Sequence, residues 1–163
     1  MTTWFKTTLG LFAVAAALAL AIPASAAGNT QIRGVAQYDE TCDAAPGAIP
    51  SQFTMRLTGD LVGCWYTPGW DVTVSTPSGV YQERGTETFV GCFADGTGCG
   101  TFSTTYTFTA KYAADGSQLH GRCQHPIVAG SGTGVFEDAT GRLDFKDDVD
   151  CGVAHYRGHI KLN

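Results

Sequence analysis

Residues 101–112 carry the sequence feature that most constrains the fold, a strict alternation along twelve residues. Aromatic residues, Ala110 and one threonine occupy every second position, and Ser, Thr or Lys stands between them. A period of two is that of a β-strand with one buried face. At roughly 3.3 Å per residue the segment spans about 40 Å, which is long for a strand and suits one that is tilted across a barrel.

Shorter segments along the chain have the same alternation. We expect strands over residues 31–38, 53–58, 61–66, 71–75, 80–83, 86–93, 119–123 and 156–162. Residues 39–51 have no period and are expected to form a loop, and pairs such as Gly59-Asp60 and Asp115-Gly116 mark turns. No segment has a helical period. The sequence therefore predicts one all-β domain of about eight strands, either a sandwich or a barrel.

Residues 130–145, GSGTGVFEDATGRLDF, form a glycine-rich segment. We expect close backbone approach or a positive φ at its glycines and apolar anchors between them. These are Gly130, Gly132, Gly134 and Gly141, with Val135, Phe136, Leu143 and Phe145. The order of GxGxF, a short spacer, Ala-Thr-Gly and an alternating strand resembles the glycine-rich segment of the allene oxide cyclase and dirigent barrels.

This resemblance favours the barrel over the sandwich, because that family consists of small, eight-stranded antiparallel β-barrels of calycin-like shape. A closed sheet also leaves no exposed edge. Members of the family enclose an apolar cavity in which a substrate cyclises, or steer radical coupling, without a metal or an organic cofactor. The resemblance therefore implies an apolar cavity and no cofactor. It does not map catalytic residues onto positions of this chain.

Residues 1–26 have the pattern of a secretory signal peptide: Lys6, an apolar run over residues 9–22, and the small residues Ala24-Ser25-Ala26. The run is shorter than the ~20 residues of a membrane-spanning helix. We expect cleavage after Ala26, a secreted protein of bacterial type without a membrane anchor, and one domain over residues 27–163. Cleavage removes Lys6 and no acid, so the formal charge of −5 becomes more negative, which argues against nucleic-acid partners.

All six cysteines lie after the expected leader: Cys42, Cys64, Cys92, Cys99, Cys123 and Cys151. In an oxidising compartment an even number favours disulfides over thiol chemistry. Cys92 and Cys99 flank a short turn, so this is the first pair that we expect to be bridged. Among the other four, pairing Cys42 with Cys64 and Cys123 with Cys151 would tie the loop that holds one cysteine to a nearby strand that holds the other. The sequence does not decide this connectivity.

The histidines do not predict a metal site. On a strand, Cys123 and His125 face one side and His120 the other, and His155 and His159 are about 13 Å apart at ~3.3 Å per residue. We expect the histidines on solvated faces of strands.

Two glutamates are candidates for general acid or base chemistry. Glu83 and Glu87 share the parity of Tyr81 and Phe89, so both would point to the apolar face unless Gly85 resets the register. A cavity, if the barrel holds one, would be lined by the aromatic residues of the longest strand and two others. These candidate ligand-binding residues are Trp65, Tyr66, Phe102, Tyr106, Phe108 and Tyr112.

Three functions follow from these patterns. The first is binding of a small apolar molecule inside a secreted, disulfide-stapled barrel. The second is a cofactor-free cyclase or isomerase that uses a buried carboxyl of Glu83 or Glu87. The third is a secreted interaction or inhibitor module that presents the loop between Cys92 and Cys99. The sequence names no substrate and no oligomeric state.

Overall fold

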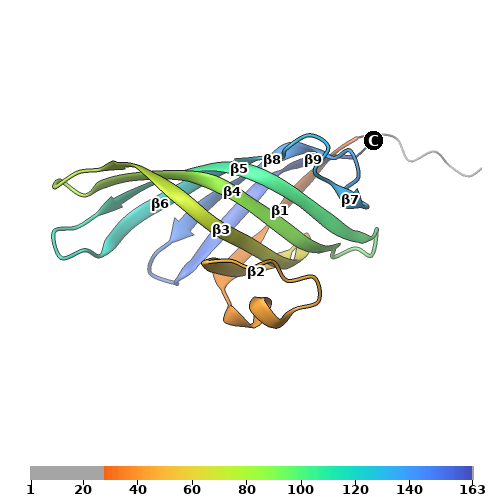
Figure 1. Cartoon of the computed structure of the whole chain (residues 1–163), viewed down its shortest axis with the longest axis horizontal. Coiled ribbons are helices and arrows are strands. Elements are labelled where there is room, and N and C mark those ends of the chain that lie inside the picture. Colours follow the sequence, from red (N-terminus) through yellow and green to blue (C-terminus); the bar gives the residue numbers. More distant parts are fainter. Residues whose placement is uncertain (1–27, 163) are drawn as a thin grey trace, which may run out of the picture.

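The chain folds into a closed, eight-stranded antiparallel β-barrel with one additional short strand (Figure 1). The structure is a computed structural model and describes residues 28–162, so the expected leader lies outside the described residues. The elements are β1 (Asn29–Tyr38), the 3-10 helix η1 (Glu40–Ala44), β2 (Phe53–Gly59), β3 (Leu61–Ser75), β4 (Val80–Phe93), β5 (Cys99–Tyr112), β6 (Gln118–Pro126), β7 (Thr133–Gly134), β8 (Thr140–Asp148) and β9 (Val153–Lys161). The prediction of an all-β barrel is confirmed.

The barrel closes because β4 pairs with both β3 and β5. Around the wall the order is β4, β3, β2, β1, β9, β8, β6 and β5, and the two-residue strand β7 lies beside β5. Neighbours in the wall are also neighbours along the chain, with two exceptions: β8 joins β6 across the short β7, and the first strand β1 pairs with the last strand β9. The turns between β3 and β4 and between β5 and β6 lie at one end of the molecule, and β7 lies at the other (Figure 1).

Two strands are longer than the sequence indicated. β3 runs on through Pro68, where the sequence predicted a break, because a register shift between Tyr66 and Gly69 accommodates the missing backbone donor. β4 is continuous through Gly85, and its pairing with β5 has no register shift. A Cβ at Gly85 would lie 2.7 Å from the ring of Tyr106, so the glycine makes room for that ring.

The glycine-rich segment closes one end of the barrel. Its Phe136 is fully buried, with ring centroids 5.0 Å from Phe93, 5.1 Å from Phe102 and 5.8 Å from Phe89. A Cβ at Gly132 would lie 1.7 Å from the carbonyl oxygen of Phe136, and this contact requires glycine. The expected close approach or positive φ is confirmed at all four glycines. We call residues 130–139 the plug.

Two of the three expected disulfides are present, Cys42–Cys64 and Cys92–Cys99. The prediction that Cys123 and Cys151 are also bridged is wrong, because both are free thiols. Cys123 faces the barrel interior and pairs across the wall with Phe145, whereas Cys151 is exposed in the turn six residues further on. β8 runs on for three residues past Phe145 before that turn, roughly 10 Å at ~3.3 Å per residue, which is already beyond the Cα separation of about 4.4–6.8 Å that a disulfide allows.

Candidate functional site

A cavity of about 390 Å³ opens at the end of the barrel opposite the plug. Seven strands contribute to its wall, from β2 to β6 together with β8 and β9. Sixteen residues line it: Phe53, Met55, Thr67, Trp70, Tyr81, Glu83, Glu87, Tyr106, Phe108, Tyr112, Gln118, Cys123, His125, Phe145, Asp147 and Ala154. This is within the size range of small-molecule sites, and its surface is mostly apolar.

Glu87 lies at the floor of the cavity and is 5 % exposed. Its Oε1 accepts a hydrogen bond of 2.6 Å from Thr67, and its Oε2 accepts one of 2.7 Å from the Trp65 indole. Both partners come from β3, which pairs with β4 across the wall. The unbroken register of β4 therefore aims this carboxyl inward, as the parity of the sequence indicated.

His125 is the second polar group of the floor, and its Nδ1 lies 2.7 Å from Oε2 of Glu87. The ring is 2 % exposed and stacks on Tyr106 with centroids 5.7 Å apart. Neither ring nitrogen makes a well-aligned hydrogen bond with the residues that the structure describes. A carboxylate in contact with an imidazole is a pair that can hold or move a proton.

The expectation that the histidines lie on solvated faces is wrong for His125 and right for His120 and His155, which are exposed. In β6 the odd-numbered residues Gly121, Cys123 and His125 face inward. The sequence did indicate this position, because His125 has the same parity as Cys123 and therefore faces the same side of the strand. The prediction failed because it followed the usual preference of histidine for the surface.

Glu83 lies nearer the mouth of the cavity and is half-buried. It accepts hydrogen bonds from the phenols of Tyr106, at 2.9 Å, and Tyr81. Burial and the hydrogen bond to the Glu83 carboxylate raise the pKa of Tyr81 to about 12. The same two causes raise the pKa of Tyr106, so both phenols stay protonated and donate to the carboxylate.

Of the six expected ligand-binding aromatics, three line the cavity and three do not. Tyr106, Phe108 and Tyr112 line the cavity. Trp65 lies beneath the floor, where its ring packs against His125 and Phe102, and Phe102 belongs to the closed core around the plug.

Tyr66 does not line the cavity. It points out of the barrel wall and packs with the Cys42–Cys64 disulfide, and its hydroxyl donates a 2.9 Å hydrogen bond to the carbonyl of Cys42. Adjacent residues on a strand face opposite sides, so Trp65 and Tyr66 cannot both face inward.

Several cavity residues have no motif that would have marked them in the sequence. Phe53 and Met55 come from β2, Trp70 from the end of β3, and Asp147 from the end of β8. They meet only because β2, β8 and β9 complete the wall opposite β4 and β5. Pairing between strands that are far apart in the sequence brings these residues together. The alternation within a single strand does not reveal which residues of other strands lie beside it.

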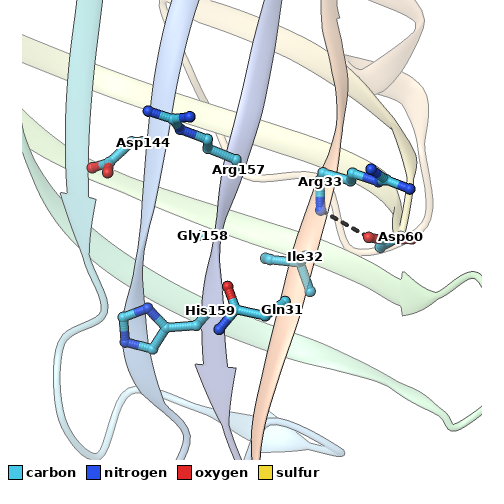
Figure 2. Close-up of a pocket in the computed structure, with 8 residues that line it drawn as sticks. All are labelled: Gln31, Ile32, Arg33, Asp60, Asp144, Arg157, Gly158 and His159. Carbon is cyan, nitrogen blue, oxygen red and sulfur yellow. Dashed lines mark hydrogen bonds between the residues drawn. The ribbon is translucent and has the colours of Figure 1, made fainter.

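A larger hollow of about 570 Å³ lies on the outer surface over β1, β8 and β9 (Figure 2). Arg33, Asp144, Arg157 and His159 lie around it, and the backbone amide of Arg33 donates to Asp60 at 2.8 Å. It has no aromatic wall, and oppositely charged side chains share it. The cavity inside the barrel, with its buried polar floor, is the better candidate despite its smaller volume.

Within residues 28–162, no group of three or more His, Cys, Asp or Glu side chains is placed to hold a metal ion. No helix in the same range is long and apolar enough to span a membrane. Comparison with protein-family models, with curated proteins and with solved structures finds no match for this chain.

Proposed function

We propose that this protein binds a small, largely apolar molecule in the cavity at the open end of the barrel, and that it does so outside the cell. The observation that carries the proposal is an aromatic cavity of about 390 Å³ with buried polar groups only at its floor. Apolar walls with a few placed polar groups are typical of small-molecule sites. The resemblance of residues 130–145 to the allene oxide cyclase and dirigent barrels, and the leader-like residues 1–26, support the cavity and the location respectively.

Titration with the neutral fluorescent probe N-phenyl-1-naphthylamine tests the binding proposal. The wild-type protein is expected to bind one equivalent with an increase in fluorescence. Ala154, on β9, faces the cavity, and Ala154→Trp fills it and is expected to abolish the signal. The matched control is Val128→Trp, at an exposed site beside the plug, which leaves binding unchanged. Equal binding by both variants would contradict the proposal.

A second candidate is a cofactor-free isomerase or cyclase. The contact between Glu87 and His125 favours it, because a buried carboxylate beside an imidazole can remove a proton from carbon and return one elsewhere. Once a co-purified ligand is identified by native mass spectrometry, incubation in D₂O is expected to label it with deuterium. Labelling that persists in Glu87→Gln and His125→Gln would exclude this role for the pair.

A further inference from the structure

The cavity is negatively charged as well as aromatic. Three carboxylates line it, those of Glu83, Glu87 and Asp147, and none of the sixteen lining residues is Lys or Arg. The partners of Glu83 are two phenols, and the partner of Asp147 is the amide of Gln118. These partners are neutral donors, so they orient the carboxylates without cancelling their charge.

The three carboxylates lie close enough together to affect the same neighbouring side chains. Burial first, and then the charges of Glu87, Glu83 and Asp147, raise the pKa of the Cys123 thiol, which lies in the cavity wall. Burial and the charges of Glu83 and Asp147 likewise raise the pKa of Tyr112. His125 contacts Glu87, and the lining has no Lys or Arg that could contact Glu83 or Asp147.

The walls of the cavity are also suited to a cation. Seven of the lining residues are Phe, Tyr or Trp, and the negative face of an aromatic ring attracts an ammonium group. Two of them, Tyr81 and Tyr106, donate hydrogen bonds to Glu83, and Tyr106 and Phe145 pack on His125, which lies against Glu87.

His125 is an independent indication of a missing partner at the floor. It is 98 % buried and lines the cavity; its Nδ1 lies 2.7 Å from Oε2 of Glu87, whereas its Nε2 has no hydrogen-bond partner within the described part of the chain. Buried polar groups almost always have a hydrogen-bond partner, and leaving one without a partner destabilises the folded protein. A ligand group that donates a hydrogen bond would supply one.

We propose that the ligand of this cavity is an organic cation, an apolar body that carries a protonated amine, which Glu83, Glu87 and Asp147 recognise together with the aromatic walls. This inference rests on the proposed binding function and names the class of its ligand. Repulsion from the acids disfavours a carboxylate or phosphate ligand of the same size, because no Lys or Arg lines the cavity. The small volume favours an amine with a single ring or a short chain over a polyamine or a peptide.

Three probes with one common body test this inference: 4-phenylbutylamine, 4-phenylbutan-1-ol and 4-phenylbutanoate, titrated by calorimetry at pH 7. The amine is expected to bind at least tenfold more tightly than the alcohol, and the carboxylate at least tenfold more weakly. The advantage of the amine is expected to shrink at high salt, because it is electrostatic.

Charge-neutral variants identify the groups responsible. Glu83→Gln and Glu87→Gln are each expected to reduce the preference for amine over alcohol severalfold while alcohol binding is retained. Glu83 is half-buried and bonded to two phenols, so this variant remains informative if Glu87→Gln, at the buried floor, fails to fold. The control is Glu137→Gln, an exposed glutamate on the plug at the other end of the barrel.

The outcomes separate the two proposals. Equal affinity for amine and alcohol, with both lost in Ala154→Trp, would overturn the cation inference and leave the binding function intact. An amine preference that survives both glutamine variants would also overturn it. If none of the three probes and no neutral naphthylamine binds, the binding function itself fails and the inference fails with it.

Discussion

At the scale of single residues, the Tyr156 hydroxyl joins β9 to the turn between β2 and β3. It accepts a hydrogen bond of 3.0 Å from the amide of Leu61 and donates one of 3.1 Å to the carbonyl of Thr58. The residue is 2 % exposed, and burial raises the pKa of this phenol to about 12. Its protonated form is thus stabilised by folding.

This buried phenol makes the protein sensitive to alkali. Because the folded pKa is higher than the unfolded pKa of about 10, the contribution of Tyr156 is complete below pH 10 and is lost as the pH rises toward 12. The contribution of Tyr156 to the free energy of unfolding is expected to fall by about 2–3 kcal/mol in total. Urea unfolding of wild type and Tyr156→Phe at pH 7, 9.5 and 11 measures it as the difference between the two proteins.

Tyr156→Phe is also expected to lower the free energy of unfolding at pH 7 by about 1–2 kcal/mol, because the amide of Leu61 loses a partner. Tyr38→Phe is the control, since Tyr38 is 54 % exposed and its hydroxyl donates only to Glu40 at the surface. A difference between wild type and Tyr156→Phe that does not change with pH would contradict the titration.

The two free thiols give a second prediction at this scale. Cys151 is exposed and Cys123 is buried, so Ellman's reagent is expected to modify one thiol in the folded protein and two after unfolding. The hydrogen bond to Asp148 and its charge raise the pKa of Cys151, so labelling is expected to be faster at pH 9 than at pH 7. No reactive thiol in denaturant would mean that Cys123 and Cys151 are bridged after all.

At the scale of elements, the two disulfides connect different parts of the fold: one links two paired strands, and the other links a short helix to the barrel wall. Cys92–Cys99 closes the hairpin between β4 and β5, whose strands pair along their whole length. Cys42–Cys64 joins η1 to the outer face of β3 and packs against Tyr66. The sequence separations are 7 and 22 residues, so the second bridge closes the longer loop.

We therefore expect removal of Cys42–Cys64 by paired serine substitutions to cost more stability than removal of Cys92–Cys99. Loop-closure entropy gives about 3 kcal/mol for the longer loop and about 2 kcal/mol for the shorter. Limited proteolysis is expected to cut residues 39–51 only in the variant without Cys42–Cys64. There this segment has lost its covalent link to the barrel and is held by hydrogen bonds such as those from Tyr66 to Cys42 and from Arg56 to Asp39. An equal loss of stability in both variants would show that loop length does not govern their effects.

The strands were predictable from the sequence because their period is local. The parity of Glu83 and Glu87 placed both carboxyls correctly, and the alternation over residues 101–112 placed Tyr106, Phe108 and Tyr112 in the wall. What depends on pairing between distant strands was not predictable. Asp147 enters the cavity from β8, and Cys123 lies buried in the barrel wall while Cys151 is exposed in the turn after β8.

At the scale of the whole molecule, the two ends of the barrel have different compositions. The closed end is filled by packed phenylalanines around Phe136, and the open end holds carboxylates and the cavity. Trp65 separates them, because its ring contacts Phe89 and Phe102 on one side and His125 on the other. Substitutions at the closed end are therefore expected to change mainly stability, and substitutions at the open end mainly ligand binding.

Paired substitutions at the two ends test this separation. Phe136→Ala removes the ring that three other phenylalanines contact and is expected to cost about 3–5 kcal/mol, with the affinity for N-phenyl-1-naphthylamine unchanged within about twofold. Ala154→Trp fills existing space and is expected to lose the probe while costing at most about 1–3 kcal/mol. Urea unfolding and probe titration of both variants measure the two effects. Loss of probe binding in Phe136→Ala, at a temperature where it is still folded, would show instead that the plug sets the shape of the cavity through Trp65.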